Sequence, residues 1–151
     1  MQAALARACM FACLLALAGC ATLAPRPLPP QVHSVQVRVI VFSFPRVRLG
    51  VELDVHNPNA SDIDVAALEL AISVEGEPVA RATLARPATL PARANALLML
   101  DASGHLGAAL AGAARGLTRG GGPLRYVVEG SVQLRNGASY PFRRSGVLVH
   151  V

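Results

Sequence analysis

The 151-residue sequence contains no lysine and no tryptophan, and its aromatic content is only 4%. So few aromatic rings argue against a stacking platform for nucleic acid. It also lacks an uncharged apolar run of about 18 residues, so no membrane-spanning helix is expected. Cysteine is scarce, and all three cysteines fall within the first twenty residues. What remains is a chain long enough for one ordinary domain, 53% apolar with a formal charge of +5, which is too apolar to be disordered.

Residues 1–19 predict a secretory signal that is removed from the protein. Arg7 supplies a short positive region, and residues 8–18 form an uncharged stretch that is too short to cross a bilayer. This stretch ends in Leu17-Ala18-Gly19-Cys20, which resembles the lipobox of bacterial lipoproteins. The resemblance implies a thioether-linked diacylglycerol and an N-acyl chain on Cys20, with no other cofactor. The alternative is an ordinary signal peptide with an incidental cysteine.

Cleavage before Cys20 has consequences for the whole protein. Cys9 and Cys13 leave with the signal, so the remaining chain has neither a free thiol nor a disulfide. The acyl chains make anchoring stable, because each buried CH₂ group adds about 0.8 kcal/mol. Residue 21 is alanine and not aspartate, which by the sorting pattern of lipoproteins implies the outer membrane. We therefore expect a protein that is anchored by lipid and faces the periplasm.

Residues 20–33 predict a tether between the lipidated cysteine and the folded domain. Proline at this density favours an extended polyproline II conformation. A dozen such residues, at about 3.1 Å each, would hold the domain roughly 35 Å from the lipid. The globular domain is expected over residues 34–151. The prolines of the tether are Pro25, Pro27, Pro29 and Pro30.

The domain is dominated by an alternation of apolar and polar residues, which is typical of strands with one buried face. Val47 to Val55 shows it most clearly, and Asn136-Gly137 is the strongest turn signal. Residues 106–117 instead have helical spacing and predict one helix, either packed on the sheet or resting on a membrane. We therefore expect an all-β fold with one helix, a seven-stranded antiparallel β-sandwich. The predicted strands are 35–41, 47–55, 68–74, 79–84, 96–100, 124–134 and 139–151.

The order of these segments resembles the late embryogenesis abundant type 2 family, also called the water stress and hypersensitive response domain. Asn57-Pro58-Asn59 follows a strand, and the segments EGEPVA, LRYVVEGSVQL and SYPFRRSGVLV come after it in the family's order. The resemblance implies a fibronectin- or immunoglobulin-like sandwich and a non-enzymatic role in desiccation and other stress. It implies no catalytic residue, and Asn57 and Asn59 would fix the loop or, alternatively, contact a ligand. Four further residues stand at family-like places: Tyr126, Gly130, Pro141 and Gly146.

The sequence offers little for metal or nucleophilic chemistry. Its four histidines are spread along the chain without helical ligand spacing, so no metal site is predicted. Asp62 and Asp64 are interpreted as solvated turn carboxylates, because a calcium loop would need more oxygen ligands. Neither a nucleophile elbow nor a phosphate loop is present. We therefore expect no enzyme, and export makes nucleic acid an improbable partner.

These observations favour a lipid-anchored stress-protection protein that acts by binding or shielding. The alternative is an envelope assembly adaptor or a module for an apolar ligand, using a sheet edge or a groove. An enzyme that depends on His56 is the third class. The membrane, through the lipid anchor, is the expected partner, and an envelope protein or an apolar ligand is the further candidate. Nothing in the sequence indicates an oligomeric state.

Overall fold

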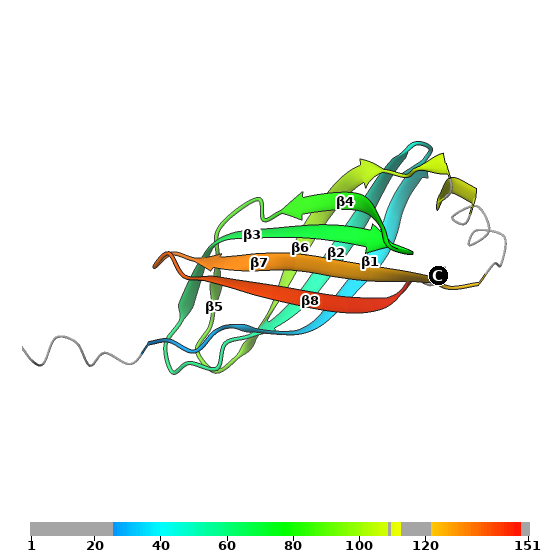
Figure 1. Cartoon of the computed structure of the whole chain (residues 1–151). Helices are drawn as coiled ribbons and strands as arrows, with labels where there is room; N and C mark the ends of the chain where they lie inside the picture. The colour runs from blue at the N-terminus through cyan, green and yellow to red at the C-terminus, as the bar shows by residue number, and fades with distance from the viewer. Residues whose placement is uncertain (1–25, 109, 113–121, 149–151) are drawn as a thin grey trace, which may run out of the picture.

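The computed structural model of the protein describes residues 26–108, 110–112 and 122–148. The described residues form eight strands, which are labelled in Figure 1. Each of the seven predicted strands corresponds to one of them, and the short β5 was not predicted. The strands are β1 (Gln31–Ser43), β2 (Arg46–His56), β3 (Ile63–Val74), β4 (Glu77–Thr83), β5 (Ala88–Leu90), β6 (Asn95–His105), β7 (Leu124–Leu134) and β8 (Ser139–Leu148).

All strand pairs are antiparallel and belong to one sheet, in the order β1-β2-β6-β4-β3-β7-β8, with β5 on β3. The sheet curls so that β1, β2 and β6 cross β3, β7 and β8 (Figure 1). Its halves join where β4 pairs with β6, at Ala80 opposite Gly104 and Arg81 opposite Ser103. The predicted antiparallel all-β class is confirmed. The fibronectin- or immunoglobulin-like sandwich is not, because one continuous sheet connects both halves.

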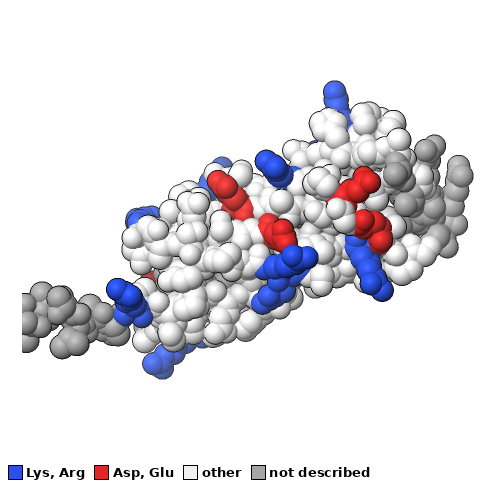
Figure 2. Space-filling model, in the orientation of Figure 1, with Lys and Arg blue, Asp and Glu red and all other residues white. Residues whose placement is uncertain are grey.

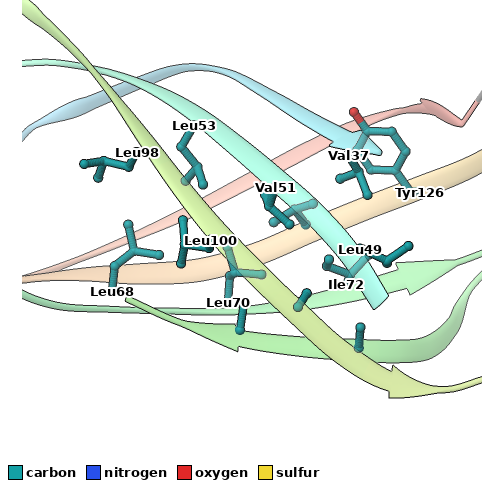
Figure 3. Close-up of a cluster of buried hydrophobic side chains, with 14 of the residues drawn as sticks. Val37, Leu49, Val51, Leu53, Leu68, Leu70, Ile72, Leu98, Leu100 and Tyr126 are labelled. Atoms are coloured by element: carbon teal, nitrogen blue, oxygen red, sulfur yellow. The ribbon is translucent and has the colours of Figure 1, made fainter. Parts of the chain in front are cut away.

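The core lies between the two halves of the curled sheet. Alternate residues of β2 are buried from Val47 to Val55, as a period of two requires. β3 does the same with Leu68, Leu70 and Ile72, and Figure 3 shows these side chains pointing toward those of β2 and β6. The apolar faces of both halves therefore share one core, which removes them from water.

Two tight turns follow the sequence signals for hairpins. Glu75 and Gly76 between β3 and β4 have φ values of 49° and 85°, which is the type I′ pattern. In the turn between β7 and β8, Gly137 has φ of 87° and Asn136 Oδ1 accepts from Ala138 N at 3.0 Å. These local turns fix the register of the two hairpins.

Two glycines of the β7–β8 hairpin each lie opposite an aromatic residue. Gly130 pairs with Phe142, and an added Cβ would lie 2.8 Å from the Phe142 ring and 2.4 Å from the Glu69 carbonyl. Gly146 pairs with Tyr126, whose ring and hydroxyl would lie 2.4–2.5 Å from such a Cβ. In each pair the ring occupies the space that glycine leaves. At Gly130 the backbones of β7 and β3 also approach closely, and both strands stay in register there.

Side chains from β7 and β8 reach β1, which lies at the opposite end of the sheet order. The Tyr126 hydroxyl donates to the Val35 carbonyl at 3.0 Å, and the Arg144 guanidinium donates to the Val32 carbonyl. β1 and β8 are therefore neighbours, although they form no ladder within the described residues. These two hydrogen bonds link the two ends of the curled sheet.

Stability should fall above pH 10 because of Tyr126. Burial raises the pKa of the Tyr126 hydroxyl above its ordinary 10.0, and the Val37 backbone offsets part of the rise. Because the folded state holds the proton more tightly, this contribution is complete below pH 10 and is lost as the pH rises through the folded pKa. Tyr126→Phe should remove this loss and lower the free energy of unfolding by about 1 kcal/mol at pH 7.

Urea unfolding of both proteins between pH 7 and pH 11 measures this effect. Tyr140→Phe is the matched control, because Tyr140 is the other tyrosine of the chain. That variant should keep the wild-type decline at high pH. A decline of equal size in Tyr126→Phe would contradict the assignment to Tyr126.

The two ends of the domain differ from the sequence prediction in extent. β1 begins at Gln31, so strand pairing reaches into residues that we assigned to the tether, and Pro30 is already buried. Of the predicted helix over residues 106–117, the structure describes helical backbone at residues 108 and 110–112, where Leu110 is buried. Leu106 precedes the helix and donates its N–H to the Pro45 carbonyl. Residues 113–117 lie outside the described residues.

Candidate functional site

The Asn57-Pro58-Asn59 loop, between β2 and β3, is organised around one buried amide. Among the described residues Asn57 is the buried polar side chain, with 0% exposure. Its Nδ2 donates to the Ser61 carbonyl at 2.9 Å and to the Leu90 carbonyl at 3.0 Å. Its Oδ1 accepts from the Asn59 backbone N–H at 2.9 Å and from Asn59 Nδ2 at 3.0 Å. Because all four hydrogen-bonding positions of the amide are used, Asn57 fixes the loop.

Asn59 connects this loop to the proline-rich segment that precedes β1. Its Oδ1 accepts from the Leu28 N–H at 2.7 Å, and its Nδ2 donates to the Leu28 carbonyl at 2.9 Å. The side-chain amide therefore pairs with the backbone of Leu28 as a neighbouring strand would. We call this pair of hydrogen bonds the clasp. Arg93 lies beside it, because its N–H donates to the Asn59 carbonyl at 2.9 Å.

Asp62 and Asp64 hold the same end of the molecule together. Asp62 Oδ1 accepts from the Ala92 N–H at 2.8 Å. Asp64 Oδ1 accepts from Thr89 Oγ1 at 2.9 Å, and its other oxygen lies 3.6 Å from the Arg135 guanidinium. The two carboxylates therefore position the segment around β5. Our interpretation of them as solvated turn residues left out these contacts.

His56, which precedes the loop, stacks on His33 from β1. The ring centroids are 5.3 Å apart and the planes differ by 11°. His56 Nδ1 lies 2.8 Å from Asn95 Oδ1, and Asn95 Nδ2 donates to Asp54 Oδ2 at 3.2 Å. The structure thus brings together two histidines that the sequence places far apart.

A β-bulge explains why sequence reasoning missed this pair. Val32 pairs with Val55 and Ser34 pairs with Asp54, so β1 has one extra residue at His33. Such a bulge turns two successive side chains toward the same face. His33 and Ser34 are accordingly both exposed. A spacing rule based on strict alternation gives no sign of this arrangement.

Three further expectations from the sequence concern a metal site, a membrane-spanning helix and the lipobox. In the ranges 26–108, 110–112 and 122–148, no group of three or more His, Cys, Asp and Glu side chains is placed to hold a metal ion. In the same ranges no helix is long and apolar enough to cross a membrane. The lipobox residues Leu17, Ala18, Gly19 and Cys20 lie outside the described residues.

A comparison with protein families agrees with the loop and the strand order. The model of a family described as late embryogenesis abundant protein matches residues 52–146, which is more than half of the chain. The chain belongs to the late embryogenesis abundant type 2 family. The matched span begins within β2 and ends within β8 at Gly146, so it includes Asn57, Asn59 and both glycine–aromatic pairs. Membership of this family supports a protein of the stress and desiccation type.

Solved structures share the fold of this family member at low sequence identity. A solution structure from Arabidopsis thaliana has a TM-score of 0.66 and 15% identity, covering 86% of this chain and 87% of that chain. A crystal structure from Archaeoglobus fulgidus has a TM-score of 0.53 and 15% identity, covering 80% and 98%. The search of the curated proteins found no match. At these identities the structures show the fold alone.

Proposed function

We propose that this family member is a lipid-anchored protein of the cell envelope, attached through Cys20 to the outer membrane and facing the periplasm. It protects the envelope during drying and related stress by binding or shielding, without turnover. Family membership supports the stress-protection part of the proposal. The order of Arg7, an uncharged stretch and Leu17-Ala18-Gly19-Cys20 supports the anchor.

The clasp is the structural observation that carries the proposal. It joins the segment that follows Cys20 directly to the Asn57-Pro58-Asn59 loop of the family domain. A segment that merely remained after removal of a signal would need no such partners. Here both backbone groups of Leu28 are bonded to one side chain, Asn59. The described end of the proposed tether is therefore bonded to the domain, which supports a short link to a lipidated Cys20.

A deletion strain complemented with variants tests the proposal. Cys20→Ala should incorporate no labelled palmitate, should accumulate as precursor and should fail to restore survival after drying or osmotic shock. Cys13→Ala is the matched control, because Cys13 leaves with the signal, and it should behave as wild type. Palmitate in Cys20→Ala would contradict the anchor, and unchanged survival of the deletion strain would contradict the protective role.

One observation favours a second candidate, an envelope adaptor or a module for an apolar ligand. Val39, Ile40, Val41 and Phe44 are each 45–58% exposed around the turn from β1 to β2. Apolar side chains gathered on a surface commonly mark an interaction site. Photo-crosslinking from position 44 in intact cells separates the two functions. One stoichiometric partner favours the adaptor, whereas diffuse contacts of low yield favour general protection.

A further inference from the structure

We propose that the end of the domain formed by the Asn57-Pro58-Asn59 loop faces the membrane and contacts the anionic headgroups of the anchoring lipids through its arginines. The clasp fixes this orientation. We call this end the loop end; it also contains the start of β1 and the turn between β7 and β8 (Figure 1). The inference rests on the lipid anchor proposed above and adds to it a defined lipid-facing surface.

The clasp sets how far the domain can stand from the membrane. Leu28 is the first residue after Cys20 that is bonded to the domain among the described residues, and Pro30 and Gln31 continue into β1. Eight residue steps therefore separate the acylated cysteine from a fixed point. A fully extended chain spans at most about 3.6 Å per residue, so these eight steps reach no further than about 29 Å, which is less than the roughly 35 Å expected for a free tether. The loop end is thus the end that the tether holds close to the lipid.

The charges of the loop end suit an anionic surface. Arg26, Arg86 and Arg93 are exposed, and none of them forms an ion pair with another described residue. Arg26 is two residues from the clasp, Arg93 donates its backbone N–H to Asn59, and Arg86 lies in the segment between β4 and β5. Free guanidinium groups close to anionic lipid are attracted to it, and this attraction fades within a Debye length.

The two carboxylates nearest the Asn57-Pro58-Asn59 loop have partners within the domain. Asp62 is bonded to the Ala92 N–H, and Asp64 is paired with Arg135. The other end of the domain has charges of both signs, with Glu75 and Glu77 at the β3–β4 turn and Arg46 and Arg48 at the start of β2. Figure 2 shows basic side chains around the end where the described chain begins, and basic and acidic side chains together over the middle and the far end of this face. The loop end therefore presents basic groups on this face, and none of its three free arginines is paired with a neighbouring carboxylate.

Energy transfer from a labelled protein to headgroup-labelled vesicles measures this orientation. With Cys20 acylated, a single introduced cysteine is the only free thiol. Ser61→Cys places the donor at the loop end and Ser43→Cys places it at the other end of β1, and both serines are exposed. Strands of this length separate the two positions by roughly 35 Å. The lipidated full chain in vesicles with phosphatidylglycerol should show at least twofold greater transfer from position 61.

Two variants test the causes of the orientation. Replacing Arg26, Arg86 and Arg93 by glutamine should at least halve the difference between the two donors, as should vesicles of phosphatidylcholine alone. The matched control replaces Arg46, Arg48 and Arg81, which also form no ion pair within the described chain, and should leave the difference unchanged. Leu28→Pro removes the N–H that donates to Asn59 Oδ1, one of the two hydrogen bonds of the clasp. It should lower the transfer from position 61, because a weakened clasp lengthens the tether.

The outcomes separate this inference from the proposed function. Equal transfer from both positions in a protein that carries palmitate would overturn the orientation and leave the anchor intact. An equal response to the two arginine triplets would overturn the role of the loop-end arginines. If the full chain isolated from cells carried no palmitate and did not remain bound to the vesicles, the proposed anchor would be wrong. The orientation, which depends on the anchor, would then be wrong as well.

Discussion

Replacing Asn57 by alanine should lower the free energy of unfolding by about 3 kcal/mol, because it leaves buried polar groups without partners. The Ser61 and Leu90 carbonyls would lose their donors, and the Asn59 N–H would lose its acceptor. Water cannot replace a side chain that is 0% exposed without opening the loop. The clasp should weaken as well, because Asn57 Oδ1 also orients the Asn59 amide.

Asn136→Ala is the matched control for this prediction. Asn136 Oδ1 likewise accepts a hydrogen bond from the N–H two residues later, but the Asn136 side chain is exposed. Its replacement should lower stability by only about 0.5 kcal/mol. Urea unfolding of both variants gives the comparison. If Asn57→Ala stayed within about 1 kcal/mol of Asn136→Ala, the buried amide would not be what holds the loop.

Replacing Gly104 by alanine should lower the free energy of unfolding by about 3 kcal/mol or more. The added Cβ would clash with the backbone where the two halves of the sheet are joined. A Cβ at this position would lie 1.8 Å from the Val79 carbonyl oxygen and 2.7 Å from Ala80 Cα. Both atoms belong to the backbone and cannot rotate away. Gly104 opposite Ala80 is also one of the two residue pairs that join β6 to β4.

Gly50→Ala is the control for Gly104→Ala, since it makes the same chemical change in a strand. Its Cβ would lie 3.2 Å from Ile40 Cδ1, the tip of an exposed side chain that can move. We expect a change of about 0.5 kcal/mol in either direction. Thermal unfolding followed by circular dichroism measures both variants. Equal stability of the two would show that the β4–β6 junction yields more easily than the geometry indicates.

The sequence predicted the parts of the fold that depend on local pattern. The alternation from Val47 to Val55 identified β2, and Asn136-Gly137 identified the last hairpin. β5 was missed because three residues are too few to show a period. The joining of both halves into one sheet was missed because only two residue pairs connect β4 with β6. A pairing of only two residues on each strand, about 20 residues apart in the sequence, does not change the alternation of apolar and polar residues.

The candidate site was predicted only in part for the same reason. Asn57-Pro58-Asn59 was identified as a loop, and its bonds agree with a role in fixing that loop. The partner of Asn59 could not be predicted, because Leu28 lies 31 residues away in a segment whose prolines indicate an unpaired chain. The composition of a segment indicates the conformation that the isolated segment favours. The clasp depends instead on a tertiary contact with Asn59.

The hydrogen bonds from Tyr126 and Arg144 to β1 have a consequence for a protein that drying concentrates. An uncovered strand edge offers a row of carbonyl and N–H groups to any neighbouring chain, and intermolecular sheets grow from such edges. Along β1 the Val32 and Val35 carbonyls are already bonded to Arg144 and Tyr126 of the same molecule. Two of the carbonyl groups that could accept hydrogen bonds from a neighbouring copy are thus already occupied. A sheet shared between crowded copies is therefore harder to start at β1.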